Sequence, residues 1–451
     1  GPVGEGREAR VQPYVVVMFT LLGTGCLTPW NSLAGAIDFF GALLPNCDPA
    51  DAFAVANFSA NLLFLIIQLH FCKCFSARAV IGLLVYVLVL LFPLWLAWAF
   101  YAPLSDSEFV LEHTLFAILV GGVALAGAAG AGLQVVVLAL AGQMGSECTG
   151  AFMNGQAVAG IITSLCRILS KLFFEDRQPF EALRLSSMLY FFSSVSVVLL
   201  CLWSWFSLQR LPVTKEARVA MSRPDSRRDS TTSFDASLPD LRTENQINSF
   251  SASLDRERDM DVGNPPEWDD GDGGIVQAWK CVWPAAGGVM MVFWATLAVF
   301  PGVVTRIPSA GFDPRNWMPV ILIATFNVGD LIGRYSAGIL DSFVSASVLS
   351  SMVIARIAIV PLLIWLQLYP TALQGYHDAA AIFTVLMLAV TNGLCASLTL
   401  IKGQRRVMPG RQNETASTIL ALAMCLGLVL GAVTALPISV LAIHYTPQPP
   451  A

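Results

Sequence analysis

Charged residues are scarce in this sequence, and their scarcity excludes an ordinary water-soluble globular protein. Of the 451 residues, 13% are charged and 55% are hydrophobic, and the mean hydropathy is +0.66. Soluble domains contain about 25% charged residues, whereas chains that cross a bilayer repeatedly contain far fewer. The composition therefore predicts a polytopic membrane protein.

Histidine is also rare, with four residues in the whole chain. An intramembrane enzyme would need paired carboxylates, a His-rich metal cluster or an activated nucleophile, and the apolar stretches contain no such pattern. Of the ten cysteines, only Cys47 falls in a predicted outer loop, so we expect free thiols. We therefore expect no enzyme, and no cofactor, metal or nucleic-acid partner.

Apolar stretches long enough to cross a bilayer, roughly 17 to 25 residues, occur in two groups. Six begin near Tyr14, Phe53, Ala79, Thr114, Ala151 and Leu185, and five begin near Trp279, Trp317, Ser345, Ala380 and Thr415. The residues between them are polar and carry charges of both signs, which predicts a disordered cytosolic loop. We expect an all-α fold of eleven transmembrane helices, with a six-helix bundle at 1–209, the loop at 210–277 and a five-helix bundle at 278–451.

Lysine and arginine predict the orientation of the chain. The loops LPNCDPAD and YAPLSDSEFVLEH contain neither residue, whereas the opposite side receives the long loop and the segments around Arg78 and Lys402. The exceptions on the outer side are Arg177, Arg184, Arg306 and Arg315. Because basic residues favour the cytosolic side, we expect a cytosolic N-terminus, an extracellular C-terminus and residence in the plasma membrane, in contact with lipid.

The eighth stretch contains the polar sequence FNVGDLIGR. Asn327, Asp330 and Arg334 lie at offsets 0, 3 and 7, so a helix places all three on one face. A charged group near the bilayer centre costs at least about 2.5 kcal/mol unless it is paired or hydrated. The stripe therefore indicates a buried polar partner, a water-filled cavity or a substrate site. The alternative is an Asp330–Arg334 pair that only neutralises itself.

The first stretch is interrupted by helix-breaking residues, in the sequence GTGCLTPWNSLAG. Gly23, Gly25 and Pro29 are tolerated at membrane depth where protein or a cavity satisfies the freed backbone groups. Trp30 and Asn31 follow directly, and together they offer a stacking surface and a polar anchor for a flat ligand. The alternative is a packing kink in which Trp30 fills space.

Together these motifs resemble the equilibrative nucleoside transporter family. PWN and FNVGDLIGR are accompanied, in order along the chain, by GLQVVV, NGQAVAG, FPG, ARIAIVPLL and TNGLCASL. The resemblance covers the whole chain apart from the charged loop. It implies an eleven-helix relative of the major facilitator fold that moves nucleosides, and also nucleobases, by alternating access and facilitated diffusion.

The resemblance also implies a substrate site of seven residues. They are Leu27 and Trp30 at the nucleobase end, Gln134 at the base edge, Asp330 and Arg334 at the ribose hydroxyls, and Asn31 and Asn327 as supporting amides. A vicinal diol is matched by a carboxylate acceptor and a guanidinium donor, and both contacts are strong in a dehydrated site.

Two other transport functions remain open at this point. One branch of the family moves monoamines, and a cation carrier needs an unpaired carboxylate in its cavity. That branch has an acid in the fifth stretch, where this sequence has Gln156, so cation transport is the weaker reading. The other alternative is proton-coupled transport of nucleosides or nucleobases. Asp330 could titrate, but Arg334 favours its ionised form.

Two further features suggest regulation of transport. Arg78 begins the third stretch and Glu414 the eleventh, both at the predicted inner face, where an ion pair would form a gate. The alternative is that each charge only anchors its own helix end. In the loop, Arg227 and Arg228 precede Ser230, which suits a basophilic kinase, and a plain solvated loop is the alternative.

Three more charged residues fall close to the ends of apolar stretches. Arg167 and Arg356 each lie within reach of a span end or a packed partner, and we interpret Arg356 as structural. Asp38 lies near the outer mouth, and we interpret it as a helix cap.

Overall fold

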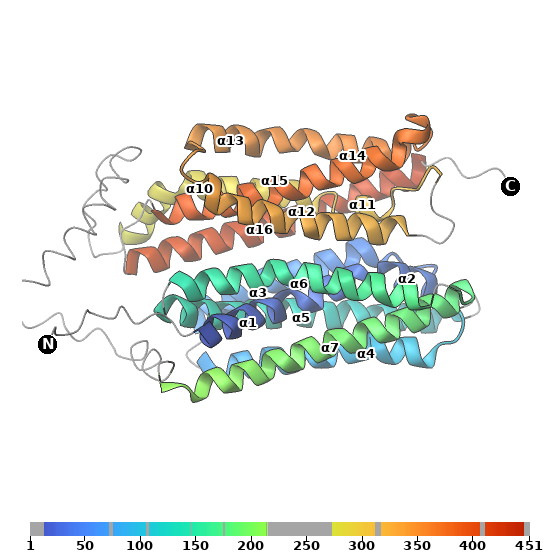
Figure 1. The fold of residues 1–451 in the computed structure, drawn as a ribbon, viewed down its shortest axis with the longest axis horizontal. Coiled ribbons are helices and arrows are strands. Elements are labelled where there is room, and N and C mark those ends of the chain that lie inside the picture. The colour runs from blue at the N-terminus through green and yellow to red at the C-terminus, as the bar shows by residue number, and fades with distance from the viewer. Residues whose placement is uncertain are drawn as a thin grey trace, which may run out of the picture.

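The computed structural model consists of two helical bundles that lie side by side (Figure 1). It describes residues 13–71, 75–104, 108–144, 146–174, 176–212, 214, 273–311, 317–405 and 411–445. Every regular element in these ranges is a helix. The boundary residues 209/210 and 277/278 of the expected domains remain predictions, but α10 begins at Gly273, inside the range expected for the loop.

The first bundle is built around α1. Its helices are α1 (Pro13–Gly35), α2 (Ile37–Leu43), α3 (Pro49–Phe71), α4 (Phe75–Ala99), α5 (Phe109–Met144), α6 (Ser146–Phe173) and α7 (Pro179–Arg210). Helix α1 packs against α6 and α7, and α5 packs against α3 and α4. The core between them is apolar, with Phe19, Leu22 and Phe191 fully buried.

The second bundle is built around the pair α12 and α15. Its helices are α10 (Gly273–Leu297), α11 (Gly302–Thr305), α12 (Met318–Leu340), α13 (Ala346–Ala355), η2 (Arg356–Ala358), α14 (Ile359–Leu368), η3 (Gln374–Tyr376), α15 (His377–Arg405) and α16 (Arg411–Tyr445). The two bundles meet where α12 packs against α6 and where α16 packs against α3.

Glycine sets the close approach of α12 and α15. A Cβ atom at Gly333 would lie 2.2 Å from the Val390 carbonyl oxygen, and one at Gly393 would lie 2.1 Å from the Asp330 carbonyl oxygen. Apolar side chains gain little from leaving lipid, so small residues that allow close packing hold membrane helices together. The reciprocal glycines therefore fix Asp330 against α15.

Ten helical segments of the described residues are long and apolar enough to cross a membrane. The eighth of the eleven expected spans, α12, is not among them, because Asn327, Asp330 and Arg334 lower its mean hydropathy. Its 23 residues still give it the length of a membrane-spanning helix. A multi-pass membrane fold is therefore supported, and the count of eleven remains a prediction.

The ends of the bundles can be related to the predicted orientation. Helix α1 begins at the left of Figure 1 and α16 ends at the right, as an odd number of crossings requires. The right-hand end holds the loops predicted to be extracellular, including residues 44–48. We refer to it as the predicted outer end and to the other as the predicted inner end.

Candidate functional site

The middle of α1 presents one partly exposed stripe. From Leu22 to Gly35 every residue is buried except Leu27, Trp30 and Asn31. Positions three and four residues apart share a helix face, so these three side chains form a continuous surface. Trp30 packs against Phe58 of α3 with ring centroids 4.7 Å apart. The three α1 residues predicted from the sequence therefore lie together.

Asn327 crosses from the second bundle to the first. Its Nδ2 donates a hydrogen bond to Ser164 Oγ of α6 over 2.8 Å. A Cβ atom at Gly160 would lie 2.7 Å from Asn327 Oδ1, so glycine leaves the space that this amide occupies. Asn31 and Ser164 line one small cavity between α1, α6 and α12. Ser164 therefore contacts one predicted amide and shares a cavity with the other.

Sequence reasoning missed Ser164, although a signal was present. Gly160, Ser164 and Arg167 lie at offsets 0, 4 and 7 in α6. This spacing places them on one helix face. Ser164 meets Asn327 of α12, whereas Arg167 bonds to Asp38 within the first bundle.

Asp330 and Arg334 form the predicted pair. Arg334 Nε donates to Asp330 Oδ2 over 2.7 Å, and Asn392 Nδ2 of α15 donates to Asp330 Oδ1 over 2.7 Å. Asp330 is 9% exposed, whereas Arg334 is partly exposed. Within the described ranges, Nε is the only Arg334 nitrogen that donates a hydrogen bond. Its two terminal nitrogens therefore remain able to bind a ligand.

Gln134 lies on α5, which packs against both α1 and α3. Its side chain is partly exposed, and its amide makes no hydrogen bond to any residue that the structure describes. It is therefore near the helices that carry Trp30 and Phe58, but no contact joins it to the Asp330–Arg334 pair. Its role at the base edge remains a prediction.

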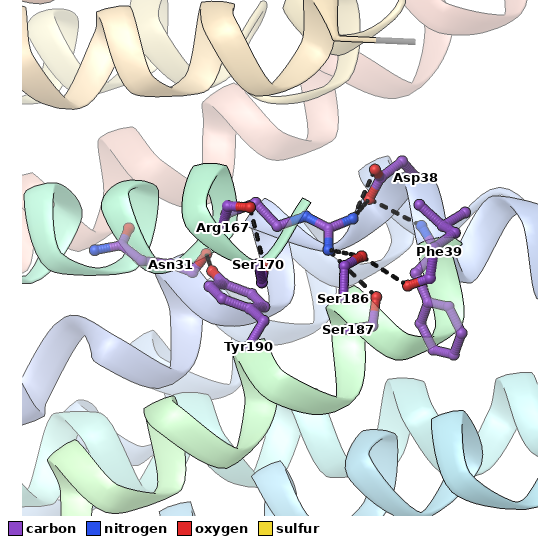
Figure 2. Close-up of polar contacts among 9 residues, drawn as sticks. Asn31, Asp38, Phe39, Arg167, Ser170, Ser186, Ser187 and Tyr190 are labelled. Atoms are coloured by element: carbon purple, nitrogen blue, oxygen red, sulfur yellow. Dashed lines mark hydrogen bonds and ion pairs between the residues drawn. The ribbon is translucent and has the colours of Figure 1, made fainter. Parts of the chain in front are cut away.

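A second buried ion pair lies in the first bundle (Figure 2). Arg167 Nη2 donates to both carboxylate oxygens of Asp38, over 2.6 and 2.7 Å, and Arg167 is 2% exposed. Its Nη1 donates to Ser186 Oγ over 3.1 Å. Asp38 also accepts from the backbone nitrogen of Phe39. The interpretation of Asp38 as a helix cap alone was therefore incomplete, because its main partner is an arginine from another helix.

At the predicted outer end, an ion pair joins the two bundles. Arg306, which follows α11, donates from Nη2 to Asp48 and, over 3.2 Å, to Asp51 at the start of α3. A cavity of about 440 Å³ lies beside this contact and is lined by both bundles, including Asp38 and Cys47. Arg306 was an exception to the predicted charge distribution, and the acidic loop opposite explains its position.

The predicted inner gate is only partly described. Arg78 is partly buried, and its Nη2 atom has no hydrogen-bond partner within the residues that the structure describes. The side chain of Glu414 lies outside that part of the structure, and so does Ser230. The gate and the modification site both remain predictions.

The two-bundle fold of apolar helices is that of a multi-pass membrane protein and resembles the major facilitator fold. A solved major facilitator structure, a proton:xylose symporter bound to 6-bromo-6-deoxy-D-glucose, aligns with a TM-score of 0.55 at 12% identity and covers 97% of each chain. The family model for nucleoside transporters matches residues 120–440. The chain belongs to the nucleoside transporter family.

Curated relatives match over nearly the full length of the chain. Equilibrative nucleotide transporter 8 of Arabidopsis thaliana is 25% identical over 435 residues, covering 95% of both chains. Equilibrative nucleoside transporter 2 of Homo sapiens is 26% identical over 464 residues, covering 93% of this chain and 95% of the relative. The family and the major-facilitator-like fold that the sequence motifs implied are both confirmed.

Proposed function

We propose that this protein transports nucleosides across a membrane by facilitated diffusion. The observation that carries the proposal is the Asp330–Arg334 pair on α12. Its carboxylate is held in place by Asn392 while the terminal nitrogens of Arg334 remain available. A fixed acceptor beside a free donor suits a vicinal diol such as that of ribose. Membership of the nucleoside transporter family and the equilibrative relatives support this assignment.

The remaining site residues would bind the nucleobase and close around the ligand. Leu27 and Trp30 would provide an apolar surface for a flat ring, and Gln134 would provide an amide for its edge. Asn31 supports the ligand from α1. Asn327 is bound to Ser164 in this structure, so it would exchange this hydrogen bond for one to the ligand.

Transport would proceed by alternating access, with residues 1–209 and 278–451 moving as two units around the site. Such a motion needs contacts that form at one end of the molecule while the other end opens. Arg306 with Asp48 and Asp51 would be the contact at the outer end. Arg78 with Glu414 would be its counterpart at the inner end.

Labelling of Cys47 tests both end contacts. We expect Arg306→Gln to speed its reaction with a membrane-impermeant maleimide, because the outer end opens more often. We expect Arg78→Ala to slow the reaction, because an unlocked inner end keeps the outer end shut. Each labelling rate should change by at most about fivefold, because a partly hydrated ion pair contributes at most about 1 kcal/mol.

The labelling experiment has a matched control and a pH condition. Arg177→Gln removes another arginine near the predicted outer end, from an exposed pair with Glu181, and should leave the rate unchanged. Burial raises the pKa of the Cys47 thiol, and the charge of Glu112 raises it further. The rate therefore rises with pH as this thiol deprotonates, so all variants are compared at one pH. Equal rates in all variants would contradict both gates.

Substitutions at Trp30 and Gln134 test the base end of the site. Trp30→Ala is expected to weaken the binding of every nucleoside about tenfold, because a stacking surface that all of them use is lost. Gln134→Leu is expected to change the ranking among bases, because it removes specific hydrogen bonds. Competition against labelled uridine measures both effects. Trp203→Ala, which removes an exposed tryptophan of α7, serves as the control. If Gln134→Leu changes the affinity for all nucleosides by the same factor, Gln134 does not recognise the base.

The substrate class and the energy source are tested with the purified protein in proteoliposomes. We expect adenosine and uridine to enter at similar rates at two pH values, hypoxanthine to compete, and a monoamine to have little effect. Stronger competition by the monoamine would favour an organic cation carrier. Uptake that requires an inward proton gradient would favour proton-coupled transport.

The topology and the modification site are also part of the proposal. We place the N-terminus in the cytosol, the C-terminus outside and the protein in the plasma membrane. Antibody access to terminal tags in intact and permeabilised cells tests this placement. A kinase that phosphorylates Ser230 in the cytosolic loop would be detected by mass spectrometry of the protein from cells, and loss of the phosphate in Arg228→Ala would support a basophilic enzyme.

A further inference from the structure

Arg356 is a buried arginine that no carboxylate touches within the described residues. It lies at η2, the turn between α13 and α14, and is 2% exposed. Its Nη1 donates to Thr391 Oγ1 over 2.9 Å, and its Nη2 donates to Thr296 Oγ1 over 2.7 Å. A buried guanidinium with only neutral partners is destabilising. A neutral side chain would pack here at lower cost, so the charge itself needs an explanation.

Asn392 connects Arg356 to the proposed substrate site. Its Oδ1 accepts from the hydroxyl of Thr296 over 2.8 Å and from Arg356 Nη2 over 3.4 Å. Its Nδ2 donates to Asp330 Oδ1 over 2.7 Å. An amide between a cation and an anion has one favourable orientation, with oxygen toward the cation and nitrogen toward the anion. Arg356 therefore fixes the amide that fixes the Asp330 carboxylate.

The same cluster carries a surplus of positive charge. Within the part of the bundle that the structure describes, two guanidinium groups, Arg334 and Arg356, share the single carboxylate of Asp330. The next acid along the chain, Asp341 directly after α12, is paired with Lys402 over 3.4 Å at the predicted inner end. The surplus charge is therefore not neutralised beside the site.

We infer that Arg356, acting through Asn392, is a positioning and selectivity residue. It holds Asp330 in the orientation that receives ligand hydroxyls, and its charge repels organic cations from the site. The inference rests on the proposed function and narrows its substrate class to uncharged ligands that carry hydroxyl groups. Repulsion between two like unit charges that are about 12 Å apart, at an effective dielectric constant of about 20, weakens binding about tenfold, and this is the scale of effect expected of Arg356.

Three variants separate the two effects of Arg356. Each is assayed in proteoliposomes for the affinity ratio of uridine to 2′,3′-dideoxyuridine and for inhibition of uridine uptake by tetraethylammonium. Arg356→Gln should lower the uridine preference about tenfold and strengthen inhibition by the cation about tenfold. Arg356→Lys should leave inhibition by tetraethylammonium weak, because lysine keeps the positive charge. Asn392→Leu should lower the preference for uridine over 2′,3′-dideoxyuridine. Inhibition by tetraethylammonium should stay weak in this variant, because the charge of Arg356 remains.

Arg184→Gln is the matched control, since it removes a buried arginine of α7 that is 8% exposed and has no link to Asp330. It should change neither the uridine preference nor the inhibition by tetraethylammonium. A general loss of stability would lower the uptake rate without changing either of these two readouts. Unchanged ratios in Arg356→Gln would overturn the inference. If that variant does not fold, an unchanged uridine preference in Asn392→Leu overturns it instead. Absence of uridine uptake by the wild-type protein would contradict the proposed function itself, whereas uptake with unchanged ratios contradicts only the role of Arg356.

Discussion

Asp330→Asn and Arg334→Ala are each expected to lower nucleoside uptake at least thirtyfold, that is by about 2 kcal/mol or more. Either change leaves one charge of a largely buried pair without its partner, and such losses are costly in a dehydrated site. Each also removes one half of the proposed match to the ribose diol. The measurement is initial-rate uridine uptake, normalised to protein in the membrane.

The pair Arg177–Glu181 provides a control with the same spacing. These residues also lie four apart, at 3.9 Å, but their side chains are 62% and 41% exposed. Glu181→Gln should leave uptake unchanged, because a hydrated ion pair contributes little. Uptake of a free nucleobase, which has no ribose, decides what the buried pair does. Equal loss of nucleobase and nucleoside transport in Asp330→Asn would show that the pair is structural.

Gly333→Leu is expected to destabilise the second bundle by about 2 kcal/mol or more, the upper range of overpacking effects. The closest atom to a Cβ at Gly333 is a backbone carbonyl oxygen at 2.2 Å, and a backbone atom cannot move aside as a flexible side chain can. The new side chain must therefore push α12 away from α15, which separates Asp330 from Asn392. Both the unfolding temperature in detergent and the uptake rate should fall.

Gly338→Leu is the control on the same helix. A Cβ at Gly338 meets no atom within 4 Å in the described structure, so leucine should be accommodated there with little effect. Similar unfolding temperatures for the two variants would contradict the packing of α12 against α15. A fall in uptake by Gly333→Leu at an unchanged unfolding temperature would instead place its effect on the substrate site.

The sequence was sufficient to predict features that depend on the residues of a single helix. Helix periodicity brought Asn327, Asp330 and Arg334 onto one face. Trp30 and Asn31 were selected because they follow helix-breaking residues, and Leu27 was selected by the family resemblance; the structure leaves all three partly exposed. These are predictions about one helix at a time. The structure places these residues in α1 and α12, and their roles in binding remain proposals.

The contacts that sequence reasoning missed all join segments that lie far apart in the chain. Ser164 and Asn327 belong to different bundles, and nothing in either helix specifies the other as its partner. The sequence suggested that Arg356 is structural, but its link to Asp330 passes through residues of two other helices. The Arg306 contact with Asp48 depends on how two loops meet at the end of the bundles. Such pairings are set by packing, so periodicity alone cannot predict them.

The central claim is that the purified protein equilibrates nucleosides across a membrane at the Asp330–Arg334 site. The most direct test is uptake of labelled uridine into proteoliposomes without any ion gradient, followed by addition of unlabelled uridine outside. The account predicts uptake that levels off at equal concentrations inside and outside, and release of label that is accelerated by the external uridine. Uptake no faster than in protein-free vesicles, or equal to that of Asp330→Asn, would contradict it.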